Sequence, residues 1–145
     1  MSHESPTLQR AFIMNKILNG MVGLVILIHL AFLIMEMFLW TNPTISANFD
    51  LTPEQAILTA PLAANQGLYN GFLAIGLLWG WFTKREDVSI SVFFLICMII
   101  AGVYGAVTVK PSILFVQTLP AAIALLLIVF RQLTSQQNQS ISPMT

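Results

Sequence analysis

Hydrophobic and polar positions divide the chain into four long apolar runs that are separated by short polar segments. Each run is about 20 residues long, and an α-helix of that length spans the ~30 Å hydrocarbon core of a bilayer. The runs are continuously apolar and do not alternate with a period of two, so helices are favoured over barrel strands. The pattern predicts four membrane-spanning helices, at residues 17–40, 62–82, 88–109 and 112–130.

The composition is that of an integral membrane protein rather than a soluble one. Of the 145 residues, 57% are hydrophobic and only 8% are charged, whereas a soluble chain carries about 25% charged residues. This balance excludes a soluble enzyme, a disordered chain and a nucleic-acid-binding protein. The single cysteine excludes a disulfide framework and a cysteine-rich metal site.

Basic residues are distributed unevenly about the predicted spans. Cytoplasmic loops of membrane proteins carry an excess of Lys and Arg. Lys110 alone falls on one side of the spans. The basic residues on the side of the termini are Arg10, Lys16, Lys84, Arg85 and Arg131. We therefore expect an N-in, C-in membrane protein, with a tight cytoplasmic turn at residues 84–87.

The hydrophobic runs also set the predicted domain organisation. Residues 1–16 are expected to form a cytoplasmic N-terminal lead, and residues 17–131 form the four-span membrane domain. Residues 132–145 are rich in Ser, Gln and Asn and are expected to be a disordered cytoplasmic tail.

The loop between the first two spans contains a helix-start signal. Thr52 precedes Pro53, and Gln55 follows three residues after Thr52, which is the pattern of a capping box with proline at the first helical position. The pattern predicts a short external helix at residues 53–59. Pro61 is expected to separate that helix from the second span.

Each predicted span also carries polar residues, which are costly in lipid and usually face the bundle interior or a wet cavity. His29 and Glu36 are seven residues apart in the first span, about 700° of helical rotation, so they share one face. At about 1.5 Å per residue, nearly all of the polar side chains lie in the outer half of the membrane. We therefore expect a polar cup that opens outward. Its expected ligand-binding residues are Asn65, Gln66, Tyr69, Asn70, Tyr104, Thr108 and Gln117.

Glu36 and His29 are the candidate catalytic residues of this cup, because ionisable groups inside a membrane are functional candidates by default. Glu36 would act as an acid/base or a counter-charge, and His29 would exchange a proton at the floor. Trp40 and Lys110 are expected at the rim. The alternative for the amide and hydroxyl side chains is interhelical hydrogen bonding that only holds the bundle together.

No metal site and no cofactor is predicted. A chelate from one helix uses residues three or four apart, so the seven-residue spacing of His29 and Glu36 does not suit zinc. A single histidine within a span argues against haem. Gly67 and Gly71 form a G-x-x-x-G pattern, which permits either a second contact inside the bundle or a homodimer. The expected partners are membrane lipids and a small amphipathic ligand, and no nucleic acid is expected.

Several strings of this sequence resemble one protein family. They are His29-Leu30, residues 36–40, 63–74, 101–105, 108–110 and 114–117, and Pro120. These strings are similar to the small bacterial membrane family known as domain of unknown function 1304, over roughly residues 15–130. The resemblance implies a compact four-span inner-membrane protein and brings no established activity.

The sequence therefore predicts an all-α protein, a four-helix transmembrane bundle with a short external helix between spans one and two. The predicted function is binding of a small amphipathic or lipid-like molecule in the outward cup, and acid/base chemistry on that molecule is left open. Two alternatives remain. A small proton-coupled transporter would need a path from the inner side, and a structural accessory membrane subunit would use its polar groups only to join helices.

Overall fold

The computed structural model describes residues 6–83 and 88–141, and this part of the chain is all-helical, as predicted. The predicted turn at residues 84–87 lies outside the described residues. The elements in chain order are α1 (Pro6–Phe38), α2 (Pro43–Asn48), α3 (Pro53–Phe82), α4 (Ser89–Thr108), η1 (Leu114–Thr118) and α5 (Leu119–Ile141).

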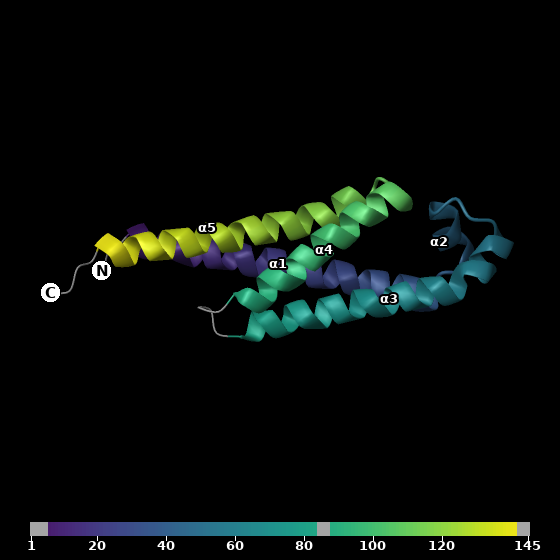
Figure 1. Ribbon diagram of the computed structural model, residues 1–145, viewed down its shortest axis with the longest axis horizontal. Coiled ribbons are helices and arrows are strands. Elements are labelled where there is room, and N and C mark those ends of the chain that lie inside the picture. Colours follow the sequence, from purple (N-terminus) through teal and green to yellow (C-terminus); the bar gives the residue numbers. More distant parts are fainter. Residues whose placement is uncertain (1–5, 84–87, 142–145) are drawn as a thin grey trace.

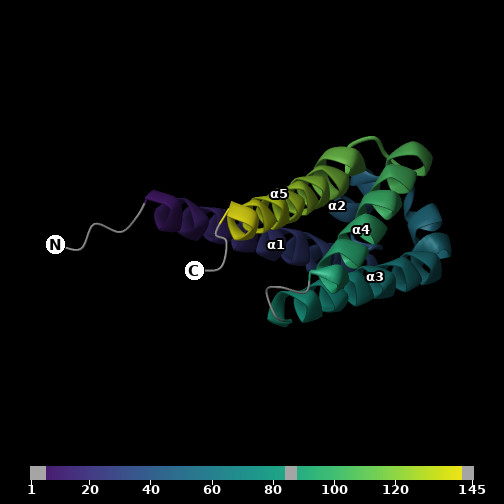
Figure 2. The ribbon, with the colours of Figure 1, turned by 60° about the vertical axis from the view of Figure 1, so that its left-hand side comes forward.

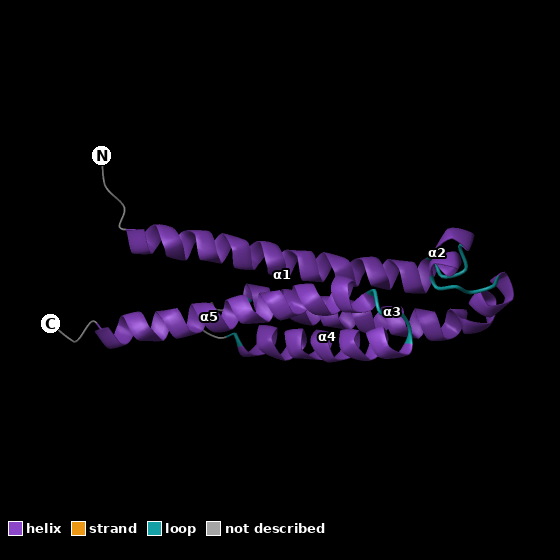
Figure 3. Cartoon of the chain, turned by 90° about the horizontal axis from the view of Figure 1, so that it is seen from above, coloured by secondary structure: helices purple, strands orange, loops and turns teal. Residues whose placement is uncertain are grey.

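The long helices run roughly along one axis of an elongated molecule (Figure 1). α1 packs most extensively against α3, and it also contacts α5. The start of α1 and the end of α5 lie at the same end of the molecule, and α2 lies at the opposite end (Figures 1 and 3). These are named below the termini end and the α2 end.

Within the described residues, three helices are long and apolar enough to cross a membrane: Gln9–Phe38, Ser89–Thr108 and Leu114–Gln137. α3 is 30 residues long, but it does not join this group. Its amide side chains Asn65, Gln66 and Asn70 reduce its hydropathy. The chain is therefore a membrane-compatible helical protein in which three candidate spans are clear. The fourth span and the orientation remain predictions.

α3 begins where the capping motif predicts, but it continues beyond the predicted end. The Thr52 hydroxyl accepts a hydrogen bond from the backbone N–H of Gln55 at 3.3 Å, and the Gln55 side chain accepts one from the Thr52 N–H at 2.8 Å. The prediction of a separate helix at residues 53–59 was wrong, because the helix runs through Pro61. Ala56 and Ala63 are both buried, on either side of that proline. They are seven residues apart and share one face, so continuous packing outweighs the lost backbone hydrogen bond.

Three other boundaries differ from the prediction. α2 was not predicted, although Asn42 caps it by accepting from the Thr44 N–H at 3.0 Å and Pro43 follows at its first turn. α1 already begins at Pro6, within the predicted lead. α5 extends to Ile141, so residues 132–141 of the predicted disordered tail are helical. Extending an existing helix adds one hydrogen bond for each residue that is fixed, which allows polar residues to follow an apolar helix.

The buried apolar core lies in the half of the molecule toward the termini end. It includes α1 residues only as far as Ile26 and α3 residues only from Ala74 onward. It likewise includes α4 residues as far as Met98 and α5 residues from Ala121 onward. Each long helix therefore contributes to the core with only part of its length.

Two glycines bring α3 close to α4 in this half. A Cβ atom on Gly76 would clash with the ring of Phe94, and one on Gly80 would clash with Ser91. Small residues of this kind let helix backbones approach closely in membranes. Toward the α2 end, α3 and α4 diverge (Figures 1 and 2).

Gly67 and Gly71 face α1. Both are buried, and a Cβ atom on Gly71 would clash with Leu33. A Cβ atom on Gly67 would lie 2.8 Å from Met37 Cγ, which is also too close. Of the two alternatives that the G-x-x-x-G pattern permits, the structure therefore has the contact inside the bundle. These glycines are not available as a homodimer seam while α1 covers them.

Candidate functional site

A layer of buried polar side chains lies next to the apolar core, on its α2 side. Its members are His29 (0% exposed), Asn70 (4%), Gln117 (8%) and Thr118 (8%). Each lies three or four residues along the chain from the nearest core residue, which is about one helical turn. These four residues are named below the polar layer. Burying such groups is costly unless they are hydrogen-bonded.

The imidazole of His29 is held from both sides. Its Nδ1 lies 2.9 Å from the carbonyl oxygen of Val25, and a carbonyl only accepts, so Nδ1 carries the proton. Its Nε2 lies 3.1 Å from Nε2 of Gln117, which donates to it. The ring is therefore a neutral imidazole in one tautomer, set by the backbone of its own helix.

Glu36 and Asn70 form the second pair, between α1 and α3. Nδ2 of Asn70 donates to Oε2 of Glu36 at 2.8 Å and reaches the Gln66 carbonyl at 3.4 Å. Oδ1 of Asn70 is buried and has no partner among the described residues. Glu36 is half-buried and lies about 10 Å from His29 along the α1 axis, toward the α2 end. The two ionisable groups thus stand at two levels of one face.

A π-helical turn delivers Gln117 to His29. In η1 the backbone N–H of Leu119 bonds to the Leu114 carbonyl, five residues back, rather than four. Pro120 has no N–H to offer the preceding turn, which explains the irregular turn just before it. π-turns are frequent at functional sites. Thr118, the residue that the sequence interpretation missed, lies in this turn, and its buried Oγ1 has no partner among the described residues.

The remaining predicted ligand-binding residues are exposed. Tyr69 is 51% exposed and Tyr104 is 71% exposed. Thr108 donates to the Tyr104 carbonyl of its own helix at 2.8 Å. Asn65 and Gln66 are exposed on α3. The structure therefore joins Glu36 to Asn70 and His29 to Gln117. Within the described residues, neither tyrosine hydroxyl is hydrogen-bonded to these pairs.

Tyr69 and Thr108 face the region where α3 and α4 diverge. Tyr69 is seven residues before Gly76, so it shares the face of α3 that contacts α4. Thr108 is fourteen residues after Phe94 and lies within about 40° of that residue's direction, on the side of α4 that contacts α3. The two helices are apart at this level (Figures 1 and 2), which accounts for the exposure.

The two predicted rim residues lie at the α2 end and hold its loops. The Trp40 indole N–H donates to the Thr59 hydroxyl at 3.0 Å, and its ring packs 4.9 Å from that of Phe49. The Lys110 ammonium donates to the carbonyl of Asn48. The second contact links the α4–η1 turn to α2, across the end where α3 and α4 are separated.

The chemistry of the site is that of one carboxyl, one neutral imidazole, two amides and one hydroxyl. No three His, Cys, Asp or Glu side chains gather as a metal site within the described residues. The two atoms without partners, Oδ1 of Asn70 and Oγ1 of Thr118, can each accept a hydrogen bond, and the hydroxyl can also donate one. The arrangement thus offers buried hydrogen-bonding groups and one carboxyl, that of Glu36, which can exchange a proton.

Comparison with known proteins identifies the family. The family model described as protein of unknown function (DUF1304) matches residues 23–129, which include Glu36 and the whole polar layer. The uncharacterized protein YpaA of Lactococcus lactis subsp. lactis (strain IL1403) is 30% identical over 94 residues, 63% of this chain and 79% of that protein. No solved structure matches the chain. The chain therefore belongs to the DUF1304 family, as its sequence strings predict.

Proposed function

We propose that this chain is a four-span protein of the bacterial inner membrane that binds a small amphipathic or lipid-like molecule between the outer halves of α3 and α4. The four spans are α1, α3, α4 and η1 with α5, and both termini are cytoplasmic. The common position of the α1 start and the α5 end supports an even number of crossings. The excess of basic residues on that side supports the direction.

The observation that carries the proposal is the divergence of α3 and α4 beyond the polar layer. The apolar core ends at this level, and Tyr69 of α3 and Tyr104 of α4 both stay exposed. Polar side chains that meet hydrocarbon directly are costly. A ligand with a polar head and an apolar body would hydrogen-bond to the tyrosine hydroxyls with its head and contact the surrounding lipid with its body.

The polar layer gives such a ligand its floor. Glu36 is half-buried and lies nearer to the α2 end than His29, so we assign it the charge or the exchangeable proton. Asn70 keeps one amide oxygen without a partner, so it can accept a hydrogen bond from the ligand while it holds the carboxyl. His29 lies deeper and is already bound on both ring nitrogens, so we assign it to positioning Gln117.

Native mass spectrometry of protein extracted in a mild detergent tests this proposal. The wild-type chain should carry a co-purified small molecule. Glu36→Gln keeps the shape and the contact with Asn70 but removes the titratable group, and Tyr104→Phe removes only a hydroxyl. Both variants should keep the fold and carry less of that molecule.

Glu54→Gln is the matched control, because Glu54 is a fully exposed carboxyl in the first turn of α3. It should retain the molecule as the wild-type chain does. Equal retention by all four proteins, or a wild-type chain without any bound molecule, would reject the proposal.

One observation favours a second function, that of a structural accessory subunit. Both polar pairs join different helices, as hydrogen bonds that only hold a bundle together do. This alternative predicts that the variants lose stability without any change in bound molecules.

A further inference from the structure

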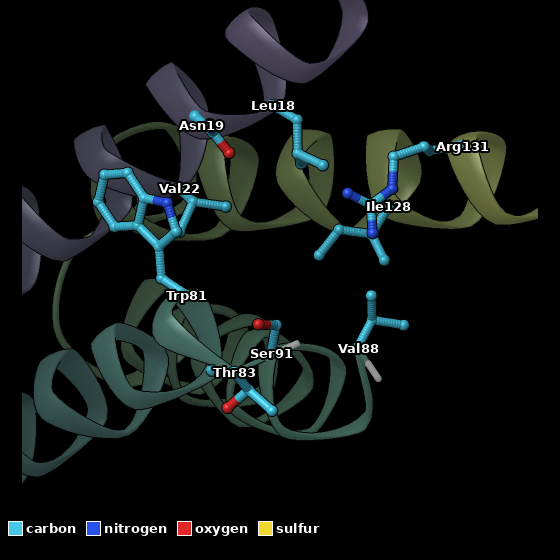
Figure 4. A pocket seen from close by; sticks show the side chains of 10 residues that line it. Leu18, Asn19, Val22, Trp81, Thr83, Val88, Ser91, Ile128 and Arg131 are labelled. Carbon is cyan, nitrogen blue, oxygen red and sulfur yellow. The ribbon is translucent and has the colours of Figure 1, made fainter. Parts of the chain in front are cut away.

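A cavity of about 130 Å³ lies where α3 ends and α4 begins, and all four long helices line it (Figure 4). It lies on the side of the apolar core away from the polar layer. It shares no residue with the polar layer, although the core residues Leu18, Val22 and Ile128 also line it. α1 contributes Asn19 and α5 contributes Arg131, while the end of α3 and the start of α4 contribute Trp81 and Ser91. The mechanism proposed above makes no use of this cavity.

Glycine packing creates the cavity's wall. A Cβ atom on Gly23 would lie 3.3 Å from the Trp81 ring, so the glycine leaves room for the indole beside α1. Gly80 likewise lets Ser91 approach α3. The first turn of α4 begins at the same place, and its N-cap residue, Val88, makes no side-chain cap. The positive end of a 20-residue helix therefore adjoins the cavity.

The lining combines one cation with neutral polar groups and an apolar wall. The guanidinium of Arg131 extends over Ile128 toward Val88, and the side chains of Asn19 and Ser91 come from the other sides of the same space (Figure 4). Arg131 has contacts within the chain, but a guanidinium carries five N–H donors and can bind an anion beside them. An arginine fork matches the oxygens of a phosphate or a carboxylate.

The size of the cavity restricts what it can hold. Pockets for drug-sized ligands measure about 300–1,000 Å³, so 130 Å³ accommodates one small polar group rather than a whole metabolite. Trp81 and Arg131 are residue types that concentrate where a membrane meets water. A headgroup in the cavity could therefore leave its acyl chains in the surrounding bilayer.

We propose that this cavity binds a phosphate group, supplied by the headgroup of an anionic phospholipid or by the free anion, with Arg131 as its main ligand. Asn19 and Ser91 donate further hydrogen bonds, and the start of α4 adds its dipole. This site is independent of the proposed function, because Glu36 and the polar layer lie beyond the core.

The test uses the full-length protein in nanodiscs of phosphatidylcholine, with or without phosphatidylglycerol. Thermal unfolding reports binding, and native mass spectrometry counts the retained phosphatidylglycerol. Arg131→Gln should weaken the apparent affinity about ten- to a hundredfold, as expected for loss of a charge-assisted bidentate contact. Arg131→Lys should recover part of that loss.

Arg10→Gln is the matched control, because it removes the same charge from an exposed position of α1 outside the cavity. It should bind phosphatidylglycerol as the wild-type chain does. Asn19→Leu changes no charge, so its weaker binding would separate a built site from general surface attraction. It also keeps the test decisive if Arg131→Gln fails to fold.

Inorganic phosphate added to phosphatidylcholine nanodiscs distinguishes the two sources of the ligand. Stabilisation by phosphate alone identifies the free anion, and stabilisation by phosphatidylglycerol alone identifies the lipid. Either result supports the site if Asn19→Leu or Arg131→Gln weakens it. Binding by Asn19→Leu and Arg131→Gln that equals that of Arg10→Gln and the wild-type chain, or no response to either phosphate source, would overturn the proposal. Glu36→Gln should leave this response unchanged, whether or not the proposed function holds.

Discussion

Nε2 of Gln117 lies 3.1 Å from Nε2 of His29, a residue 88 positions earlier in the chain. The contact joins η1 to α1 inside the polar layer. The bond from Asn70 to Glu36 joins α3 to the same helix at a level nearer the α2 end. α1 is therefore the common partner of both polar pairs, and its His29 and Glu36 organise the layer from one face.

The pair of His29 and Gln117 should be energetically coupled. Gln117→Leu leaves the buried Nε2 of His29 without a donor and should cost about 1–3 kcal/mol of unfolding free energy. His29→Phe with Gln117→Leu should cost less than the sum of the two single changes, by about 0.6–1.7 kcal/mol, the range for membrane hydrogen bonds. A double-mutant cycle of unfolding in detergent measures this difference. Strict additivity would show that the two side chains do not support each other.

Glycines at helix contacts should differ sharply from a glycine in open space. Gly76→Ala places a methyl group into the ring of Phe94 and should destabilise the bundle, because α3 and α4 must move apart. Gly20 has nothing within 4 Å of its Cβ position. Gly20→Ala should therefore raise the unfolding free energy by about 0.4–1 kcal/mol through the less flexible unfolded chain. Thermal unfolding of both variants beside the wild-type chain decides this, and equal melting temperatures for the two would contradict the packing.

Much of the helical architecture could be predicted from the sequence because its causes are local. Long apolar runs specify helices, and Thr52 with Gln55 specifies the start of α3 to the residue. The shared face of His29 and Glu36 follows from helical periodicity alone. The G-x-x-x-G pattern predicts a close contact, but only the packed structure decides that α1 provides it.

The structure departs from the predictions where packing between helices decides the outcome, because the sequence of a single segment does not show its packing partners. Pro61 reads as a helix end, yet burial of the flanking alanines carries α3 through it. In the sequence, Thr118 is an ordinary position of the predicted span at residues 112–130. The π-helical geometry before Pro120 brings it into the polar layer beside Gln117. Tyr69 and Tyr104 were predicted as ligand-binding residues of the cup, and both are exposed. The exposure of Tyr69 depends on the angle between α3 and α4, which glycines nearer the termini end control.

Topology in cells can be tested with single cysteines at described, exposed positions. With Cys97 replaced by serine, Asn48→Cys at the end of α2 should react with an impermeant thiol reagent in intact cells. Ser135→Cys near the end of α5 should be protected until the membrane is permeabilised. The reason is the excess of basic residues on the side of the termini. Labelling of Ser135→Cys alone would show that the orientation is the reverse of the predicted one. Labelling of both cysteines in intact cells would show that both lie on the outer side of the membrane.

The first turn of α3 should lose stability in acid because of Glu54. Its own backbone N–H and the Thr52 hydroxyl hold the pKa of this exposed carboxyl below its ordinary value. A carboxyl with a lowered folded-state pKa contributes stability above its unfolded pKa, and that contribution disappears as the pH falls through the folded pKa. The sensitive window therefore lies below about pH 4.5.

Thr52→Ala removes both the cap and one of the two groups that hold the charge of Glu54. At neutral pH it should lower the unfolding free energy by about 1 kcal/mol, the usual cost of losing an N-cap. Its cost relative to the wild-type chain should shrink in acid, because the wild-type carboxyl is then protonated as well. Glu54→Gln is the control, because it removes the titratable group. In the Glu54→Gln background, the cost of Thr52→Ala should therefore be the same at neutral and acid pH. The measurement is the unfolding free energy at neutral and acid pH of four proteins: the wild-type chain, both single variants and the double variant. If the cost of Thr52→Ala in the wild-type background is independent of pH, the hydroxyl does not stabilise the charge.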